Sequence, residues 1–368
     1  MKEKKVVFLI DSLQTGGTEK SLVKLARSFN KVKPIFISLF EKNDFQQELI
    51  NNGIEFHSLN LEKTYSFHKL VKPVRYLLRE INPDIIHSSL FYADMVSRRL
   101  NMEIPIINSL VSNSYSQRRF TNLKLSLKLK LKAIQFMDFY SSHKVDLFLA
   151  NSETIKEQYT KALNINADKI KVIYRGREIP QLPYKKNETE DKIFLFVGRL
   201  IESKGIQELI EAFSLIKRDN FNLQIVGEGP FRSELDKLIS KLNLEANVQL
   251  MGSQQNVNKF FEKADYFVFP SHYEGLPGAL IEAMMAKVPI IASEIPENKE
   301  CLSSEMALFH QVRNPQHLAT QLQAALTTQD WSTRTSLAHA FACEHFDIEK
   351  IAQTYEETYS ELIRELSE

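Results

Sequence analysis

Short runs of apolar residues alternate with longer segments of helical periodicity along almost the whole chain. Val6–Ile10 is apolar at every position, which is typical of a parallel strand buried on both faces. Glu19–Phe29 follows with apolar residues three and four positions apart, which predicts a helix. This alternation predicts βαβ units around a parallel sheet. It continues with further strands expected at Pro34–Phe40, Asp84–His87, Pro105–Ser109 and Asp146–Ala150.

A second series of the same kind begins after residues 180–191, where two prolines and several charges are typical of a linker. The chain ends in an amphipathic segment, Ile348–Leu366. With 368 residues in total, we expect an α/β fold with two doubly wound, Rossmann-like domains, residues 1–180 and 181–347, and a final helix at 348–368. The strands expected in the second domain are Ile193–Val197, Leu223–Val226, Val248–Met251, Tyr266–Pro270 and Pro289–Ala292.

Composition places the chain among ordinary globular proteins, with 43% apolar and 25% charged residues. It has two cysteines, Cys301 and Cys343, and no CxxC motif, which favours a reducing compartment and argues against a thiolate zinc site. No uncharged apolar run approaches the ~18 residues of a membrane span, and the N-terminus does not have the pattern of a signal peptide. We therefore expect a cytoplasmic location.

The net charge of +1 conceals a strong asymmetry. Residues 1–180 hold 29 lysines and arginines against 18 acids, whereas residues 181–368 hold 18 against 28. Halves that differ this much in charge favour two domains with different partners, although surface charge also drifts without a function.

Glycine is scarce, and its positions are informative. Nine of the eleven glycines stand where a strand is expected to end. Each alone is explained by turn chemistry, but together they indicate loops shaped around a phosphorylated ligand. The loop after the first expected strand, Asp11–Glu19, matches neither the GxGxxG motif nor the P-loop motif. This disfavours dinucleotide binding and P-loop nucleotide binding. The nine are Gly16, Gly17, Gly198, Gly205, Gly227, Gly229, Gly252, Gly275 and Gly278.

Two stretches add charged groups to these loops. Arg199 and Lys204 lie between glycines after the first strand of the second domain, where they are suited to holding a diphosphate. Glu274 precedes a predicted helix, with Gly275 and Leu276 at its entry and Glu282 two turns later. An acid beside an anion-binding helix start is best explained if it accepts hydrogen bonds from ligand hydroxyls.

These motifs, in this order, resemble the retaining glycosyltransferases of family 4, which have the GT-B fold of two Rossmann-like domains facing a cleft. The resemblance covers nearly the whole chain and is most specific at Glu274-x7-Glu282. It implies transfer of a sugar from a UDP- or GDP-linked donor to a saccharide or lipid-linked acceptor, in cell-surface polysaccharide or glycolipid synthesis. No cofactor and no metal are implied, because cations at Arg199 and Lys204 would stabilise the leaving diphosphate.

The resemblance also implies individual roles. Arg199, Lys204 and Glu274 would be catalytic, with Glu274 holding the sugar hydroxyls. Glu282 would bind the ribose. The other donor-binding positions implied are Gly16, Gly17, Gly227, Gly229, Gly275 and Leu276.

The acceptor side departs from the family pattern. Val111 stands where relatives often have a histidine, and Asn108 or Asn113 would have to replace it. His87 matches a histidine at a strand end in relatives, but a hydrogen-bonded core histidine explains it equally well. We expect His87 and Asn113 on the acceptor side.

A basic segment, Arg118–Lys132, carries six cations and no acid, and its leucines alternate with lysine and serine. A helix of this composition can bind an anionic membrane surface, which would make the protein peripheral on the cytoplasmic leaflet. A solvated helix with a core-facing leucine stripe is the alternative interpretation.

Other functions stay open at this stage. A nucleotide-sugar 2-epimerase, a phosphorylase or a catalytically impaired donor-binding protein would use a similar fold. Nucleic-acid binding is disfavoured, because the cations are not interleaved with stacking aromatics and no nucleic-acid motif is present.

Overall fold

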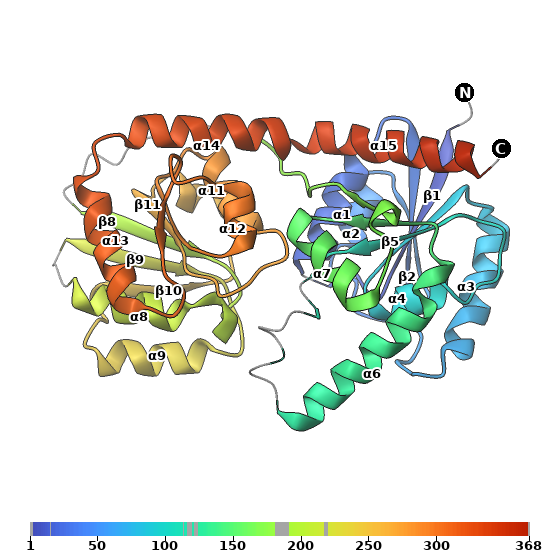
Figure 1. Cartoon of the computed structure of the whole chain (residues 1–368), viewed down its shortest axis with the longest axis horizontal. Coiled ribbons are helices and arrows are strands. Elements are labelled where there is room, and N and C mark those ends of the chain that lie inside the picture. The colour runs from blue at the N-terminus through green and yellow to red at the C-terminus, as the bar shows by residue number, and fades with distance from the viewer. Residues whose placement is uncertain are drawn as a thin grey trace. The chain divides into compact units, whose positions relative to one another are not determined.

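The computed structural model describes residues 3–14, 16–112, 114–115, 120, 124–180, 191–216 and 220–366. The chain divides into two compact units. Unit 1 comprises residues 1–176 with 346–368, and unit 2 comprises 177–345. Each unit is described by itself below (Figure 1).

Unit 1 is built on a seven-stranded parallel sheet with the order β3-β2-β1-β4-β5-β6-β7. The strand β1 is buried on both faces from Val6 to Ile10, as its apolar sequence predicts. Its strands are β1 (Lys4–Ile10), β2 (Val32–Ser38), β3 (Glu55–Ser58), β4 (Ile85–Ser89), β5 (Ile106–Leu110), β6 (Leu147–Ala150) and β7 (Ile170–Val172). Its helices are α1 (Gly17–Arg27), α2 (Gln46–Asn51), α3 (Phe67–Ile81), α4 (Phe91–Ser97), α6 (Leu125–Ser141), α7 (Glu153–Leu163) and α15 (Ile348–Glu365), with 3₁₀ turns at Ser142–Lys144 and Ala167–Lys169.

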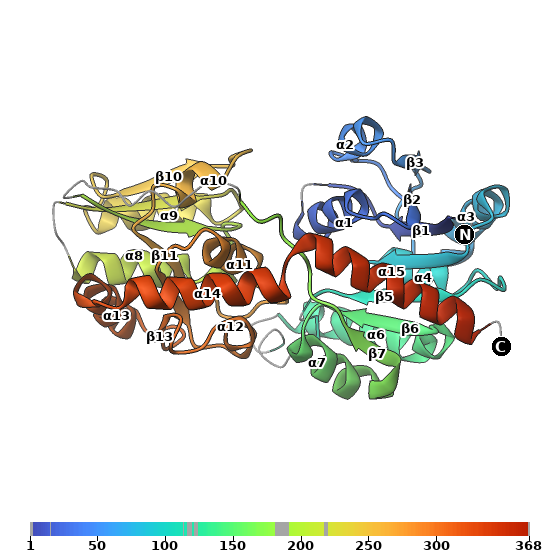
Figure 2. The ribbon, with the colours of Figure 1, turned by 90° about the horizontal axis from the view of Figure 1, so that it is seen from above.

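Alternate side chains of β1 pack into two separate hydrophobic cores, one on each face of this sheet. Phe8 packs on the face covered by α1 and α15, whereas Leu9 packs on the face covered by α3 and α4. Figure 2 shows α15 lying beside α1 and across the sheet. Tyr355 and Tyr359 of α15 are buried there, so the last helix completes the core of the first unit.

Unit 2 has a six-stranded parallel sheet with the order β10-β9-β8-β11-β12-β13. Its strands are β8 (Lys192–Val197), β9 (Phe221–Val226), β10 (Val248–Gly252), β11 (Tyr266–Phe269), β12 (Ile290–Ser293) and β13 (Leu308–His310). Its helices are α8 (Ile206–Leu215), α9 (Arg232–Lys241), α10 (Asn258–Phe261), α11 (Gly278–Met285), α12 (Pro296–Cys301), α13 (Pro315–Thr327) and α14 (Trp331–His345), with a 3₁₀ turn, η3, at Glu202–Lys204.

In both sheets the strand order reverses beside the first strand, β1 in unit 1 and β8 in unit 2. In open parallel sheets, ligands bind at the carboxyl ends of the strands where this reversal occurs. The loops after β1, β8 and β11 are therefore where a site is expected. The described part of the chain contains no helix with the length and hydropathy of a membrane-spanning segment.

Candidate active site

The loop after β8 is held against the loop after β9 by backbone contacts that require glycine. Gly227 has φ +143°, and a Cβ there would lie 1.8 Å from the carbonyl oxygen of Gly198. The Gly198 amide donates to Val226 O at 3.0 Å, and the Leu200 amide donates to Glu228 O at 3.0 Å. The predicted glycine loops thus form one continuous surface at the carboxyl ends of β8 and β9, with Gly229 in the second loop.

The loop after β11 joins the same surface. Gly205 has φ +66°, and a Cβ there would lie 2.2 Å from the carbonyl oxygen of Pro270. The His272 amide donates to Ser203 O at 2.9 Å. Three loops from three neighbouring strands are therefore fixed together by their backbones, and they carry the predicted side chains.

An ion pair spans two of these loops. Lys204 Nζ lies 2.5 Å from Glu274 Oε1, and the two side chains are only 16% and 10% exposed. The ammonium group also lies 5.6 Å from the centre of the Phe269 ring, which partly shields it from water. Because both charges are largely removed from solvent, their interaction is screened far less than that of a surface pair.

Other predicted residues of unit 2 lie in the same loops as this pair. Gly275 and Leu276 follow Glu274 directly and precede α11, whose N-cap is Pro277, so the predicted helix entry is confirmed. Arg199 is exposed and forms no ion pair with any residue that the structure describes. Its guanidinium is therefore accessible at the surface of the loop after β8.

Glu282 lies on α11, two turns beyond Glu274, and has a partner that sequence reasoning did not assign. Arg177 Nε lies 3.2 Å from Glu282 Oε1, and the arginine side chain is 14% exposed. Glu282 also lines a cavity of about 30 Å³ with Phe261 and Met285. The sequence alone does not single out Arg177, because the two partners lie far apart along the chain.

Gly16 and Gly17 lie in unit 1, where the chain passes from β1 into α1. Gly16 is the N-cap of α1, and Gly17 is the first residue of that helix. Asp11 directly follows β1, and its Oδ1 accepts a hydrogen bond from the Ala93 amide at 2.8 Å. Burial raises the pKa of Asp11 to about 6, so this carboxyl group titrates closer to neutrality than an ordinary aspartate.

His87 lies in the core of unit 1. Its Nδ1 is 2.8 Å from Tyr359 Oη, its Nε2 is 2.7 Å from Ser109 Oγ, and the residue is 1% exposed. Burial lowers the pKa of His87 to about 3, so the ring is neutral. This geometry favours the interpretation of His87 as a hydrogen-bonded core histidine, since both ring nitrogens are occupied away from any surface.

The other two acceptor-side candidates have different outcomes. Asn108 is fully buried, and its Oδ1 accepts a hydrogen bond from Arg98 Nε at 2.6 Å. It belongs to a polar network inside unit 1 and is not available to an acceptor. Asn113 lies outside the described residues.

Comparison with known proteins identifies the family. The profile described as "Glycosyltransferase Family 4" matches residues 15–179, and that described as "Glycosyl transferases group 1" matches residues 178–340. The chain is a family 4 glycosyltransferase. Anabaena HepE in complex with UDP and glucose, 20% identical, superposes with a TM-score of 0.84 over 97% of this chain and 100% of that chain. The GT-B fold predicted from the sequence is confirmed.

Two relatives of this glycosyltransferase cover most of its length. The capsular polysaccharide biosynthesis glycosyltransferase CapH of Staphylococcus aureus is 26% identical over 80% of this chain and 83% of CapH. A Campylobacter jejuni α-1,4-N-acetyl-D-galactosaminyltransferase, named for an undecaprenol-diphosphate-linked substrate, is 24% identical over 78% of this chain and 79% of that protein.

Proposed function

We propose that this glycosyltransferase moves a sugar from a UDP-linked donor to a lipid-linked saccharide with retention of the anomeric configuration. The observation that carries the proposal is the shielded Lys204–Glu274 pair, which spans the loops after β8 and β11. Support for the donor comes from the UDP and glucose bound by HepE, and support for the lipid-linked acceptor comes from the name of the Campylobacter relative. The name of CapH supports a role in polysaccharide synthesis.

The pair supplies both charges that the reaction needs. When the glycosidic bond to the diphosphate breaks, negative charge develops on the leaving oxygen, and the Lys204 ammonium can stabilise it without reorganisation of water. Binding of the diphosphate to Lys204 releases Glu274, whose carboxylate then accepts hydrogen bonds from sugar hydroxyls. The ion pair thus holds both groups in place before the donor arrives.

A second cation completes the diphosphate site. Arg199 is exposed on the same loop as Lys204 and can bind phosphate oxygens through two parallel hydrogen bonds. With two cations at the leaving group, we propose that the reaction needs no metal ion. Turnover that persists in excess EDTA would support this, and loss of turnover that added Mg²⁺ restores would contradict it.

The roles of Gly16 and Gly17 in donor binding and of Glu282 in ribose binding stay predictions. For Glu282 the structure adds a requirement, since the ribose hydroxyls would have to share its carboxylate with Arg177. Retention is tested by the anomeric coupling constant of the newly formed linkage in proton NMR, which must match that of the donor sugar.

The test of the proposed function compares two lysines in matched ion pairs. Lys204→Met removes the shielded cation, whereas Lys299→Met removes one from an exposed pair with Glu294, at 2.6 Å. We expect Lys204→Met to lower kcat/KM by roughly 10²–10³, in line with the loss of one group that stabilises developing charge. Lys299→Met should stay within about twofold of the wild type.

Glu274→Gln tests the role of Glu274 in holding the sugar hydroxyls separately from the role of Lys204 at the diphosphate. It keeps a hydrogen-bonding oxygen but loses the charge, so we expect weaker UDP-sugar binding in calorimetry and lower turnover. Unchanged kinetics in both Lys204→Met and Glu274→Gln would refute the proposed site. A change of the sugar in donor alone, without acceptor, would instead identify an epimerase.

We further propose that the enzyme acts at the cytoplasmic face of an anionic membrane, through the basic segment Arg118–Lys132. Each cation near such a surface contributes roughly 1 kcal/mol of attraction. Of this segment, the structure describes Phe120 and residues 124–132, and the helix α6 begins at Leu125.

A further inference from the structure

The helix α6 presents a continuous apolar stripe to solvent. Its buried side is formed by Asp138 and Ser141, which face the core of unit 1. On the opposite side, apolar residues recur at intervals of four, four, three and four, which places them on one face of a helix. This stripe consists of Leu125, Leu129, Ala133, Phe136 and Tyr140, of which the four large side chains are 73%, 64%, 67% and 71% exposed.

Two more large apolar side chains of α6 are exposed. Leu127 is 48% exposed and Phe139 is 47% exposed. Soluble surfaces seldom gather so many large apolar groups on one element, and such patches mark sites of interaction. The alternative interpretation, a core-facing leucine stripe, does not fit the described part of the basic segment, because Leu131 is half-buried and its other leucines are exposed.

The charges around the stripe have one sign. From Lys124 to Met137 the chain has four lysines and no acid. On a helical projection, Lys128 and Lys132 lie on one side of the stripe and Lys130 on the other. A surface that is apolar along its centre and cationic at its margins complements the acyl chains and anionic headgroups of a lipid leaflet.

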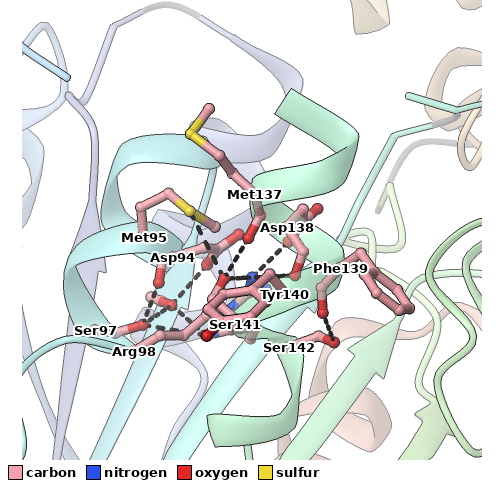
Figure 3. A network of polar contacts seen from close by, with 12 residues as sticks. Asp94, Met95, Ser97, Arg98, Met137, Asp138, Phe139, Tyr140, Ser141 and Ser142 are labelled. Carbon is pink, nitrogen blue, oxygen red and sulfur yellow. Dashed lines mark hydrogen bonds and ion pairs between the residues drawn. The ribbon is translucent and has the colours of Figure 1, made fainter. Parts of the chain in front are cut away.

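A buried network fixes the other end of α6 to the unit 1 core. The Arg98 guanidinium lies 2.5 Å from Asp138 Oδ1 and donates to Ser141 Oγ at 3.0 Å (Figure 3). Tyr115 Oη donates to Asp138 Oδ2 at 2.8 Å. In Figure 1 the first turns of α6 stand away from the sheet of the same unit. The network thus anchors one end of α6, and the stripe is left uncovered by its own unit.

We propose that the exposed stripe of α6 inserts into the boundary between headgroups and acyl chains of an anionic leaflet. This rests on the proposed function, in which the acceptor is carried by a lipid. It differs from attraction by the basic segment alone, because the stripe continues to Tyr140, beyond the last lysine of that segment. A second copy of the chain fits the surface less well, since it would bring lysines against lysines.

Vesicle flotation tests the insertion. The probe is a vesicle of phosphatidylcholine with 30% phosphatidylglycerol, compared with pure phosphatidylcholine, at low and high salt. The variant Leu129→Ser/Phe136→Ser removes two stripe side chains, and Leu215→Ser removes an exposed leucine of unit 2 (55% exposed) as a control. We expect the double variant to lower the partition coefficient by roughly 100-fold, about tenfold for each side chain, while the control changes it little.

The dependence on salt separates insertion from simple attraction. The wild type should remain partly bound to the anionic vesicles at high salt, because burial of apolar area is not screened. Phe136→Trp provides a second measurement that leaves the stripe apolar. The tryptophan fluorescence of this variant should be quenched by lipids brominated on the acyl chain. The wild type contains a single tryptophan, and its quenching under the same conditions is the reference that the variant should exceed.

Three outcomes would overturn the proposal. These are flotation of the double variant at the level of the wild type, complete release of the wild type by salt, and a wild-type dimer in solution that the double variant abolishes. Calorimetry with UDP-glucose on the same proteins keeps the two proposals apart. Normal donor binding without flotation would reject insertion and leave the proposed transfer intact.

Discussion

Replacement of Arg98 by methionine should destabilise unit 1 selectively and loosen α6. The Arg98 side chain is 1% exposed and pairs with Asp138. It also donates to Asn108 Oδ1 at 2.6 Å and to Ser141 Oγ at 3.0 Å. Removal of one partner from a buried pair costs about 3–5 kcal/mol, because the other charge is left without compensation. For a unit of this size, each kcal/mol lowers Tm by about 2–4 °C, which predicts a decrease of roughly 10 °C.

Differential scanning calorimetry and hydrogen exchange measure the two effects. We expect a lower Tm for unit 1 and faster exchange of the amides of α6, with UDP-glucose binding by unit 2 unchanged. Arg27→Met is the matched control, since Arg27 pairs with Glu48 at 2.9 Å in the same unit but is 38% exposed. It should cost less than about 1 kcal/mol.

The double variant Arg98→Met/Asp138→Leu tests the cause of the destabilisation. If the uncompensated carboxylate is responsible, its replacement by an apolar side chain should restore much of the lost stability, with a coupling energy above about 1 kcal/mol. Additive losses in the two single variants, or a loss below 1 kcal/mol in Arg98→Met, would refute the reasoning.

Two further predictions concern single carboxyl groups of unit 1. Burial raises the pKa of Asp94 to about 8, so between pH 4 and 8 the native state keeps a proton that the unfolded state releases. The free energy of unfolding should therefore fall as pH rises through this range, and Asp94→Asn should flatten the dependence in urea titrations at pH 5 and 8. Glu356 Oε1 accepts backbone hydrogen bonds from Asn30, Lys31 and Val32 at 2.8, 2.5 and 3.1 Å. Glu356→Gln should cost about 2 kcal/mol in the same titrations, and an unchanged midpoint would show that the charge is dispensable.

The strands that the sequence predicted correctly are those with strong apolar patterns. β1 and β8 lie inside their sheets, where burial on both faces favours consecutive apolar residues, and their predicted ranges agree with the structure to within two residues. The ranges predicted for β4 and β5 agree equally well, although only their first two residues form an apolar run before polar residues follow. The strands that were missed are β3, β7 and β13, each at a sheet edge. β3 has the sequence Glu-Phe-His-Ser, half-buried at every position, so no apolar run marks it.

The loops of the site were predictable, but their contacts were not. Glycine at 227 is explained only by the approach of Gly198 O, which belongs to the preceding βα unit. Arg177 and Glu282 lie far apart in the sequence, so no local sequence pattern predicts that they form an ion pair. His87 shows the opposite limit. It was predicted at the end of a strand, but β4 continues to Ser89, and both ring nitrogens are occupied in the core by Tyr359 of the last helix and by Ser109.

The helix α6 shows why amphipathic periodicity alone gave an ambiguous result for the basic segment. Its inner face combines the half-buried Leu131 and Ile134 with the buried Asp138 and Ser141, and the Arg98 network fixes this face to the unit 1 core. Its outer face, from Leu125 to Tyr140, is apolar as well, so apolar residues stand on both sides of the helix and neither side is distinctly the more apolar. A helix that packs on its own protein and also binds a lipid leaflet needs two apolar faces. Weak amphipathicity combined with high leucine content and lysines of one sign is therefore the pattern expected of such a helix, and only the solvent exposure of each side chain distinguishes its two faces.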